Sequence, residues 1–381
     1  MRPKVTTLRR GRHASAAGTE WVLHTIERWL PLSEQFVHTL VTESRHPALV
    51  VARRALEHEN VFPYEPVRSL GFIPKKGLSP RVQRGMVTVA LLALTARRRP
   101  AVVHHHHGYG AGIPMGFVLR REVPLVLSLH GEDVTADDRR HPGGLTPIFE
   151  LASAVIVPSQ FLLERAVEIG VRRDSLQVIP SGVDTRFFTP SPMPTGPPEA
   201  VFVGRFVEKK GLDTLISAWP SVQSKVPSAK LRIVGFGPLE TLARSAGEGV
   251  VVEPAQPHRR AEQVREALRR ARVVVTPSRT AADGDSESLL LVNLEAQACG
   301  RPLVTTRHGG IPEFVAEGTT SLVVPEADPE ALAEAMVSVL SDDELAHRLA
   351  AAGPSWVAQF DVRACTARVD AVYDQLIRDA A

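Results

Sequence analysis

The chain has 381 residues, of which 44% are hydrophobic and only 5% aromatic, and it carries a formal net charge of +3. This length exceeds the roughly 250–300 residues at which a single core stops growing, so we expect two domains. The mean hydropathy of −0.03 is typical of a soluble globular protein. Arginines are not interleaved with aromatic residues and no nucleic-acid-binding motif occurs, which argues against a nucleic acid partner.

Only two cysteines occur, Cys299 and Cys365, and their positions form no metal-ligand spacing. Because the sequence also shows no secretory signal peptide, we expect a protein of the reducing cytoplasm. Residues 1–190 carry 25 Lys and Arg against 17 Asp and Glu, whereas residues 191–381 carry 20 against 25. A basic first half predicts contact with something anionic, either a membrane surface or a phosphorylated acceptor.

The first half alternates apolar strands with helices. A helix is predicted over residues 81–99, around the apolar run 86–96, which is about half as long as a bilayer span requires. With its flanking arginines, this run fits either an amphipathic helix on a membrane or a buried helix with a charged end. Strands are predicted at residues 21–26, 50–53, 67–70, 101–103, 125–129, 154–157 and 176–179.

Histidines follow two of these strands. His104, His105, His106 and His107 continue the strand 101–103, and His130 follows the strand 125–129. Ligands bind at this edge of open α/β sheets. Neighbours in an extended chain point to opposite faces, and no carboxylate or cysteine follows at a suitable distance, so we expect no metal at the histidine run. A histidine at a strand end is more often structural than catalytic.

The second half repeats the alternation after a segment, residues 189–198, in which six of ten residues are Pro or Gly. Such a composition predicts a linker. Strands are predicted at residues 200–203, 231–234, 273–276, 303–305 and 322–324, and helices at 212–219, 329–340 and 362–377, the last two closing the chain. The expected fold class is α/β, with two doubly wound domains facing a cleft.

Two cations follow a glycine at the first strand-to-helix turn of this half. Gly204 allows close approach of a ligand, Arg205 can hold a phosphate with two hydrogen bonds, and Lys210 adds a point charge. The turn can equally be an ordinary solvated basic loop. Gly235 and Gly237 lack the third glycine and the downstream acid of a dinucleotide fingerprint, so NAD binding is disfavoured.

Two carboxylates, Glu287 and Glu295, lie eight positions apart around a predicted helix start. Both can face one cleft beside the positive end of the helix dipole, which suits a ligand with hydroxyls near an anionic group. Taken alone, the pair also fits a solvated helix start and a half-buried glutamate. Asp283 and Asp285 match a metal-binding Asp-x-Asp pattern, but in this architecture we interpret them as a turn.

In combination, these motifs resemble glycosyltransferase family 4, whose members are retaining enzymes of the GT-B fold. The resemblance runs from about Trp21 to the end of the chain and includes the Glu-x7-Glu motif at Glu287. The segment Leu32–Val37 is similar to the Ser-Glu-Thr-Phe-Ile segment of members that build exopolysaccharides such as colanic acid. The other matching residues are Gly204, Arg205, Lys210, His104, His106, His130, Gly182, Val183 and Asp184.

The resemblance implies a hexosyltransferase that moves a sugar from a UDP- or GDP-sugar to a glycan or lipid-linked acceptor in cell-surface polysaccharide synthesis. We expect no metal or other cofactor. We do expect the protein to contact the inner face of the membrane peripherally. The expected domains are a disordered basic tail (1–20), an acceptor domain (21–190), a linker (191–198), a nucleotide-sugar domain (199–355) and a crossover helix (356–381).

The resemblance also implies roles for individual residues. Arg205 and Lys210 would stabilise the leaving diphosphate, together with Gly204 and the helix start at Leu290, Leu291 and Val292. Glu287 would bind the sugar, Glu295 the ribose hydroxyls, and His130 the sugar or the acceptor. The alternatives are a nucleotide-sugar epimerase of the same architecture, a glycoside hydrolase, which would not need Arg205 and Lys210, and a non-catalytic sugar-nucleotide-binding protein.

Overall fold

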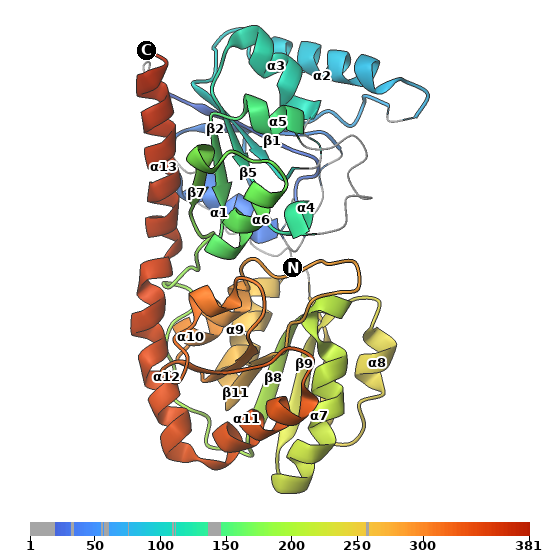
Figure 1. Ribbon diagram of the computed structural model, residues 1–381, viewed down its shortest axis with the longest axis vertical. Coiled ribbons are helices and arrows are strands. Elements are labelled where there is room, and N and C mark those ends of the chain that lie inside the picture. The colour runs from blue at the N-terminus through green and yellow to red at the C-terminus, as the bar shows by residue number, and fades with distance from the viewer. Residues whose placement is uncertain are drawn as a thin grey trace, which may run out of the picture.

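The computed structural model consists of two α/β halves, one above the other in Figure 1, with the last two helices of the chain along one side, one beside each half. It describes residues 20–381 except 32–33, 55, 57–60, 75, 109, 111, 136–145 and 257–258. The predicted basic tail, apart from its last residue, lies outside the described residues, as do Leu32 and Ser33 of the exopolysaccharide-type segment.

The first half is built on seven parallel strands in the order β3-β2-β1-β4-β5-β6-β7. Its central strands are buried at every position, as expected for parallel strands covered by helices on both faces. The strands are β1 (Val22–Ile26), β2 (Ala48–Ala52), β3 (Val67–Ser69), β4 (Val102–His106), β5 (Leu125–Ser128), β6 (Ala154–Val157) and β7 (Leu176–Val178).

The helices of this half follow their capping and apolar signals. In the helix over residues 80–94, the Ser79 side chain accepts the Val82 N–H and Pro80 occupies the first helical position. The helix ends at Leu94, so the prediction of a helix to residue 99 was wrong: residues 96–99 are exposed and have no apolar face to pack. The helices are α1 (Gln35–Glu43), α2 (Pro80–Leu94), α3 (Gly112–Arg121), α4 (Glu132–Thr135), α5 (Thr146–Leu151) and α6 (Gln160–Glu168).

The second half has six parallel strands in the order β10-β9-β8-β11-β12-β13. The predicted fold class, two doubly wound units with parallel sheets, is therefore confirmed. The strands are β8 (Glu199–Arg205), β9 (Lys230–Phe236), β10 (Val250–Pro254), β11 (Val273–Thr276), β12 (Leu303–Thr306) and β13 (Ser321–Val324). The helices are α7 (Leu212–Lys225), α8 (Glu240–Arg244), α9 (Arg260–Arg270), α10 (Leu291–Ala298), α11 (Pro329–Ser341), α12 (Asp343–Val357) and α13 (Val362–Asp379).

Helix α12 corrects the expectation that only two helices close the chain. It contains Gly353 and Pro354, which are poor helix formers. A Cβ at position 353 would lie 2.6 Å from the carbonyl oxygen of Gln297 in α10, so the glycine permits close packing of the two helices. Tertiary packing on α10 thus outweighs the local preference against helix.

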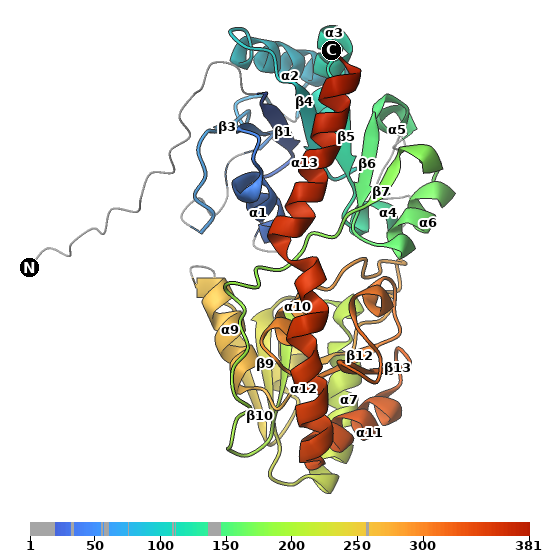
Figure 2. The same ribbon diagram turned by 90° about the vertical axis from the view of Figure 1, so that its left-hand side faces the viewer.

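The chain crosses back from α12, beside the second half, to α13, beside the first half, as predicted (Figure 2). Asp370 on this helix accepts hydrogen bonds from the Ser44 hydroxyl (2.6 Å) and the Arg45 N–H (3.1 Å) at the end of α1. The Tyr373 ring is fully buried in a cluster with Val22 of β1 and Val102 of β4. These contacts anchor α13 to the first half.

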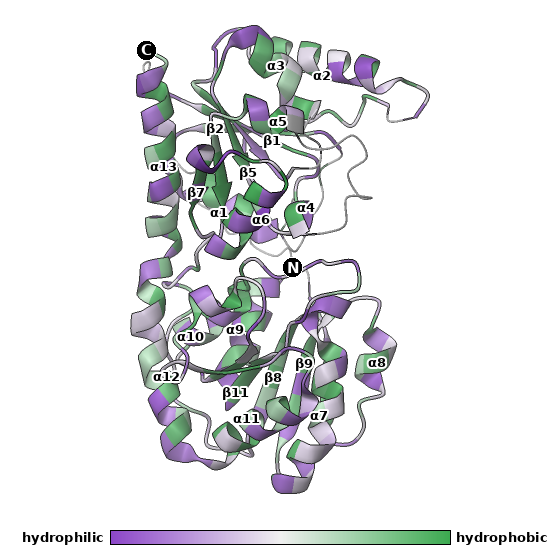
Figure 3. Cartoon of the chain, in the orientation of Figure 1, coloured by the Kyte–Doolittle hydropathy of each residue, from purple (hydrophilic) through white to green (hydrophobic). Residues whose placement is uncertain are grey.

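The hydropathy of the chain follows this layered arrangement (Figure 3). The strands are mainly hydrophobic, whereas most helices carry one hydrophobic and one hydrophilic face. The helix α2 also presents apolar side chains to solvent, with Val82 48%, Met86 38% and Val89 66% exposed. In the part of the chain that the structure describes, no helix has both the length and the apolar character needed to cross a membrane.

Candidate active site

A cavity of about 280 Å³ lies between the two halves, where the carboxyl ends of their strands meet. This is the edge at which open α/β sheets bind ligands. The structure brings every residue predicted for the site to its wall: Gly204, Arg205, Lys210, Glu287, Leu290, Leu291, Val292 and Glu295 from the second half and His130 from the first. Glu34, Gln35, Phe36, His107 and Arg260 also line it.

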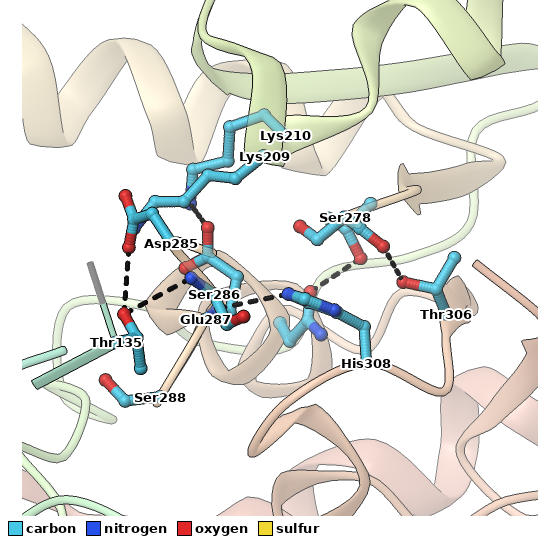
Figure 4. Close-up of polar contacts among 12 residues, drawn as sticks. Thr135, Lys209, Lys210, Ser278, Asp285, Ser286, Glu287, Ser288, Thr306 and His308 are labelled. Carbon is cyan, nitrogen blue, oxygen red and sulfur yellow. Dashed lines mark hydrogen bonds and ion pairs between the residues drawn. The ribbon is translucent and has the colours of Figure 1, made fainter. Parts of the chain in front are cut away.

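Glu287 and Lys210 form an ion pair in the wall of this cavity (Figure 4). The Glu287 Oε1 lies 2.8 Å from the Lys210 Nζ, and the two side chains are only 7% and 13% exposed. Burial alone would raise the pKa of Glu287, but Lys210 and Lys209 lower it to about 2, so it is a carboxylate at neutral pH. Two residues assigned by sequence to different parts of a ligand thus contact each other directly.

The loop before Glu287 is fixed by its own acidic residues. The Asp283 carboxylate accepts the N–H of Asp285 at 3.1 Å, which makes the predicted turn. The Asp285 carboxylate lies 2.9 Å from the Lys209 Nζ and accepts a hydrogen bond from the Thr135 hydroxyl of the first half. Asp285 therefore joins the two halves next to Glu287.

The His308 ring contacts the backbone of Glu287 (Figure 4). Its Nε2 accepts the Glu287 backbone N–H at 3.1 Å, while its Nδ1 lies 2.8 Å from the Glu326 carboxylate. Acceptance at Nε2 requires the proton to lie on Nδ1, which fixes the tautomer of this ring. At Gly309 a Cβ would lie 2.1 Å from the Glu287 carbonyl oxygen, so only glycine lets this loop pass so close.

Glu295, inside α10, lies at the far end of the same wall. Burial raises its pKa to about 7, and the positive charge of Arg260 only partly opposes the shift. Arg260 begins α9 and donates a hydrogen bond to the Gln35 side chain of the first half at 3.3 Å. Arg260 therefore acts electrostatically on Glu295 and is hydrogen-bonded to the opposite half of the molecule.

A positively polarised region faces this cavity between the two glutamates. Helix α10 starts at Leu291 with no side chain capping its N-terminus, so its first amide groups present the positive end of the helix dipole. Arg205 and Lys210 lie on the same wall. Phosphate groups bind readily to such a combination of amides and cations.

The first half contributes His130 to the opposite wall. Burial and the neighbouring His107 lower the pKa of His130 well below its usual value, so the ring is neutral. Its Nε2 is buried and has no hydrogen-bond partner among the described residues. The rings of Phe36 and His107 lie 4.5 and 4.6 Å from it, and the Ser288 hydroxyl donates to its backbone carbonyl at 2.7 Å.

The histidine run splits between three environments. His107 lies at the cavity, 3.4 Å from the Glu34 carboxylate. The His105 Nδ1 lies 2.9 Å from the Thr25 hydroxyl on one face of the sheet. On the other face, beneath α13, the His104 ring lies against the Tyr373 hydroxyl and His106 lies next to it. The run is therefore not one site.

Comparison with known proteins identifies the family. Residues 18–187 match the family described as Glycosyltransferase Family 4, and residues 197–342 match Glycosyl transferases group 1. The chain is 39% identical over 284 residues to a GDP-mannose-dependent alpha-(1-6)-phosphatidylinositol monomannoside mannosyltransferase of Mycolicibacterium smegmatis, covering 70% of this chain and 69% of that protein. The chain belongs to glycosyltransferase family 4.

A second relative of this glycosyltransferase is the protein assigned as colanic acid biosynthesis glycosyltransferase WcaL in Escherichia coli. It is 32% identical over 238 residues, which cover 60% of this chain and 58% of that protein. The matched region thus spans between about half and seven tenths of such curated relatives. The predicted family and enzyme class are confirmed.

Solved structures agree with the fold of this glycosyltransferase. Anabaena HepE, in a crystal structure with UDP and glucose, superposes with a TM-score of 0.76 at 17% identity, covering 92% of this chain and 99% of that one. Sucrose-phosphate synthase from Thermosynechococcus elongatus gives a TM-score of 0.73 at 22% identity, covering 94% and 100%. At these identities the likeness concerns the fold alone.

Sequence reasoning missed three residues of the glycosyltransferase site. No role was predicted for His308 or Arg260, and Glu34 was included only within the segment Leu32–Val37. The His308-Gly309-Gly310 sequence, directly after β12, offered a signal because it lies at the ligand-binding edge of the sheet. Nothing local distinguishes Arg260 from the other arginines of α9.

Proposed function

We propose that this enzyme is a retaining hexosyltransferase that uses a nucleotide-diphosphate sugar and acts on a glycan or lipid-linked acceptor in cell-surface polysaccharide or glycolipid synthesis. The observation that carries the proposal is the buried Glu287–Lys210 pair beside Arg205 and the uncapped start of α10. A sugar bearing a diphosphate needs both kinds of group at once, a carboxylate for its hydroxyls and cations for its phosphates.

The donor half of the reaction follows from these charges. The bond between the anomeric carbon and the diphosphate oxygen breaks, and the electron pair leaves with the diphosphate. Arg205, Lys210 and the amides at Leu291 and Val292 stabilise the charge that develops there, without reorganisation during the reaction. These cations supply what a divalent metal would otherwise supply, so the proposal includes no metal at the donor site.

Glu287 and Glu295 bind the two ends of the donor in this proposal. The ionised Glu287 accepts hydrogen bonds from sugar hydroxyls and stabilises the positive charge of an oxocarbenium-like centre. Glu295 accepts hydrogen bonds from the ribose. The acceptor hydroxyl attacks from the face that the diphosphate leaves, and its proton passes to the departing phosphate oxygen. The configuration of the sugar is then retained.

The first half receives the acceptor. His130, Phe36 and His107 form an aromatic wall opposite the donor site, and the His130 Nε2 is placed to hydrogen-bond a sugar or acceptor hydroxyl. Relatives are named for GDP-mannose and a phosphatidylinositol mannoside, and for colanic acid. We therefore propose GDP-mannose as the first donor to test, with UDP-sugars as the second group.

We further propose that the first half contacts an anionic membrane at its cytoplasmic face. Val82, Met86 and Val89 share one exposed face of α2, since they are spaced by four and three residues. The neighbouring Arg81 and Arg84 are exposed. Apolar side chains bordered by cations favour the interface of an anionic bilayer.

Thermal unfolding with a panel of GDP- and UDP-sugars tests the donor. A ligand at a hundred times its dissociation constant adds about 2.7 kcal/mol of stability, so we expect one nucleotide-sugar to raise the melting temperature by several degrees. Transfer of its radiolabelled sugar to phosphatidylinositol monomannoside then tests the acceptor. Epimerised donor or free sugar formed without acceptor would replace the proposal with an epimerase or a hydrolase, and stabilisation by none of the panel would overturn it.

A further inference from the structure

Three buried imidazoles lie together in the sheet of the first half, and one of them, His106, stacks 5.9 Å from His130 of the cavity wall. His24 lies in β1 and is paired in register with His104 in the adjacent strand β4. His106 is two positions further along β4, so its side chain projects on the same face. All three are at most 1% exposed, and α13 covers that face through Tyr373.

The geometry of the cluster matches a metal site. One nitrogen of each ring lies within 4.8 Å of a nitrogen of each of the others. The His24 Nδ1 and the His106 Nε2 are 3.0 Å apart. Two imidazole nitrogens on one tetrahedral zinc lie roughly 3.3 Å apart. The His24 and His106 nitrogens therefore have nearly the required separation. The His104 nitrogen must approach them by at most about 1.5 Å.

In the absence of a cation, these neutral rings cannot all pair their N–H groups in hydrogen bonds. Burial lowers the pKa of His24 to about 3, and all three rings are neutral. The His24–His106 hydrogen bond uses one of the two N–H groups of the pair. The accepting ring carries its proton on its outer nitrogen, the His24 Nε2 or the His106 Nδ1, and neither has a partner among the described residues. Either tautomer thus buries an unpaired N–H.

The surroundings support His104 and leave room for a water molecule. The Tyr373 hydroxyl lies 2.5 Å from its Nδ1 and the Ser128 hydroxyl 2.7 Å from its Nε2. If one of these contacts gives way to a cation, the other remains to orient the ring. A cavity of about 40 Å³ borders His106 and Ser128 and reaches His130, which is enough space for a water molecule next to the cluster.

We propose that His24, His104 and His106 bind a divalent transition-metal cation, with zinc the best fit, as a structural site that joins β1 to β4 beneath α13. Three neutral imidazoles without a carboxylate suit zinc, nickel or copper rather than magnesium or calcium. The site does not depend on the proposed donor chemistry. The run from His104 to His107 does not predict this site, because the third ligand, His24, comes from a strand 80 residues earlier.

Cobalt titration of the purified, chelator-treated enzyme tests this proposal. We expect one equivalent of Co²⁺ to give the visible absorption of a tetrahedral nitrogen site and one equivalent of Zn²⁺ to abolish it. The variants His24→Gln and His106→Gln should bind zinc at least a hundredfold more weakly. His105→Gln is the matched control, because His105 lies in the same strand but faces the opposite side of the sheet.

The stoichiometry of metal binding to the wild-type enzyme tests the proposal even if a variant misfolds. Less than stoichiometric Co²⁺ or Zn²⁺ binding by the folded wild-type enzyme would overturn the proposal and leave the cluster as a hydrogen-bonded network. Equal zinc affinity of His106→Gln and the wild type would overturn it as well. X-ray absorption of the zinc-loaded wild type should show three imidazole ligands, and any other ligand set contradicts this assignment.

Discussion

Glu295 holds its proton more tightly in the folded protein than in the unfolded chain, because burial raises its pKa from 4.5 to about 7. Between these two values the folded state binds a proton that the unfolded state has lost. This carboxyl group therefore lowers the free energy of unfolding as the pH rises from 4.5 to 7. The full decrease is reached above pH 7.

Replacing Glu295 by Gln removes this dependence. We expect Glu295→Gln to be more stable than the wild type at pH 8 and equal to it near pH 4.5. Urea unfolding of both proteins at several pH values measures the difference, in which the contributions of buried histidines cancel. A variant less stable than the wild type at pH 8 would contradict the assigned shift.

His308 positions Glu287 through a single hydrogen bond to its backbone. We expect His308→Ala to lower kcat by roughly 10- to 100-fold with little change in donor affinity, because the carboxylate loses its alignment rather than its charge. His308→Gln, whose amide oxygen can accept the same N–H, should restore part of the rate. Equal losses in both variants, or a loss confined to donor affinity, would exclude this role.

At the scale of single residues, the side chains that line the cavity were predicted because their types and spacing form a recognisable set. The sequence did not predict their partners. The ion pair of Lys210 with Glu287 joins two loops about 77 positions apart, and His24 meets His104 only because β1 and β4 are adjacent. Contacts between separate strands follow from strand order, which local patterns do not determine.

At the scale of the elements, α13 is held to the first half by Asp370. This carboxylate is 4% exposed and accepts hydrogen bonds from the Ser44 hydroxyl and the Arg45 N–H. Asp370→Ala should lower the free energy of unfolding by about 2–3 kcal/mol, since it leaves buried donors unpaired. Urea denaturation measures this loss. The exposed Asp379 of the same helix is the control, and an equal effect of Asp379→Ala would contradict the anchoring role.

The exposed face of α2 makes a second prediction at this scale. Val89→Asp should weaken binding to phosphatidylglycerol vesicles about tenfold or more, because it places a charge within the apolar face. Val251→Asp is the matched control, since Val251 is 40% exposed on β10 of the second half. Cosedimentation measures both. Equal binding of the Val89→Asp variant and the wild type would remove α2 from the membrane contact.

The strands were easier to predict from the sequence than the helices and their ends. The strand β10 was not predicted. The other strands were predicted to within a few residues because uninterrupted Val, Ile and Leu runs have few alternatives in a parallel sheet. Helix α12 was missed because Gly353 and Pro354 disfavour helix locally, and only its contact with Gln297 of α10 explains it. The helix end at Leu94 was misplaced because exposed residues carry no apolar pattern.

At the scale of the whole molecule, the donor site depends on contacts between the two halves. Thr135 and His130 of the first half bond to Asp285 and Ser288 beside Glu287, and Gln35 bonds to Arg260. The alternation of strands and helices predicted two doubly wound units, but no local pattern predicts which loops meet across the cavity. Those contacts hold the proposed acceptor wall opposite the proposed donor wall.

In the proposed mechanism, Glu287 and the Arg205–Lys210 cations act on a nucleotide-sugar in the transition state. The most direct measurement is the turnover rate of Glu287→Ala and Arg205→Ala at saturating donor, with the exposed Arg307→Ala as control. We predict at least a hundredfold loss in the first two variants, about 2.7 kcal/mol of transition-state stabilisation, with the fold retained. Near wild-type turnover in both would contradict the account.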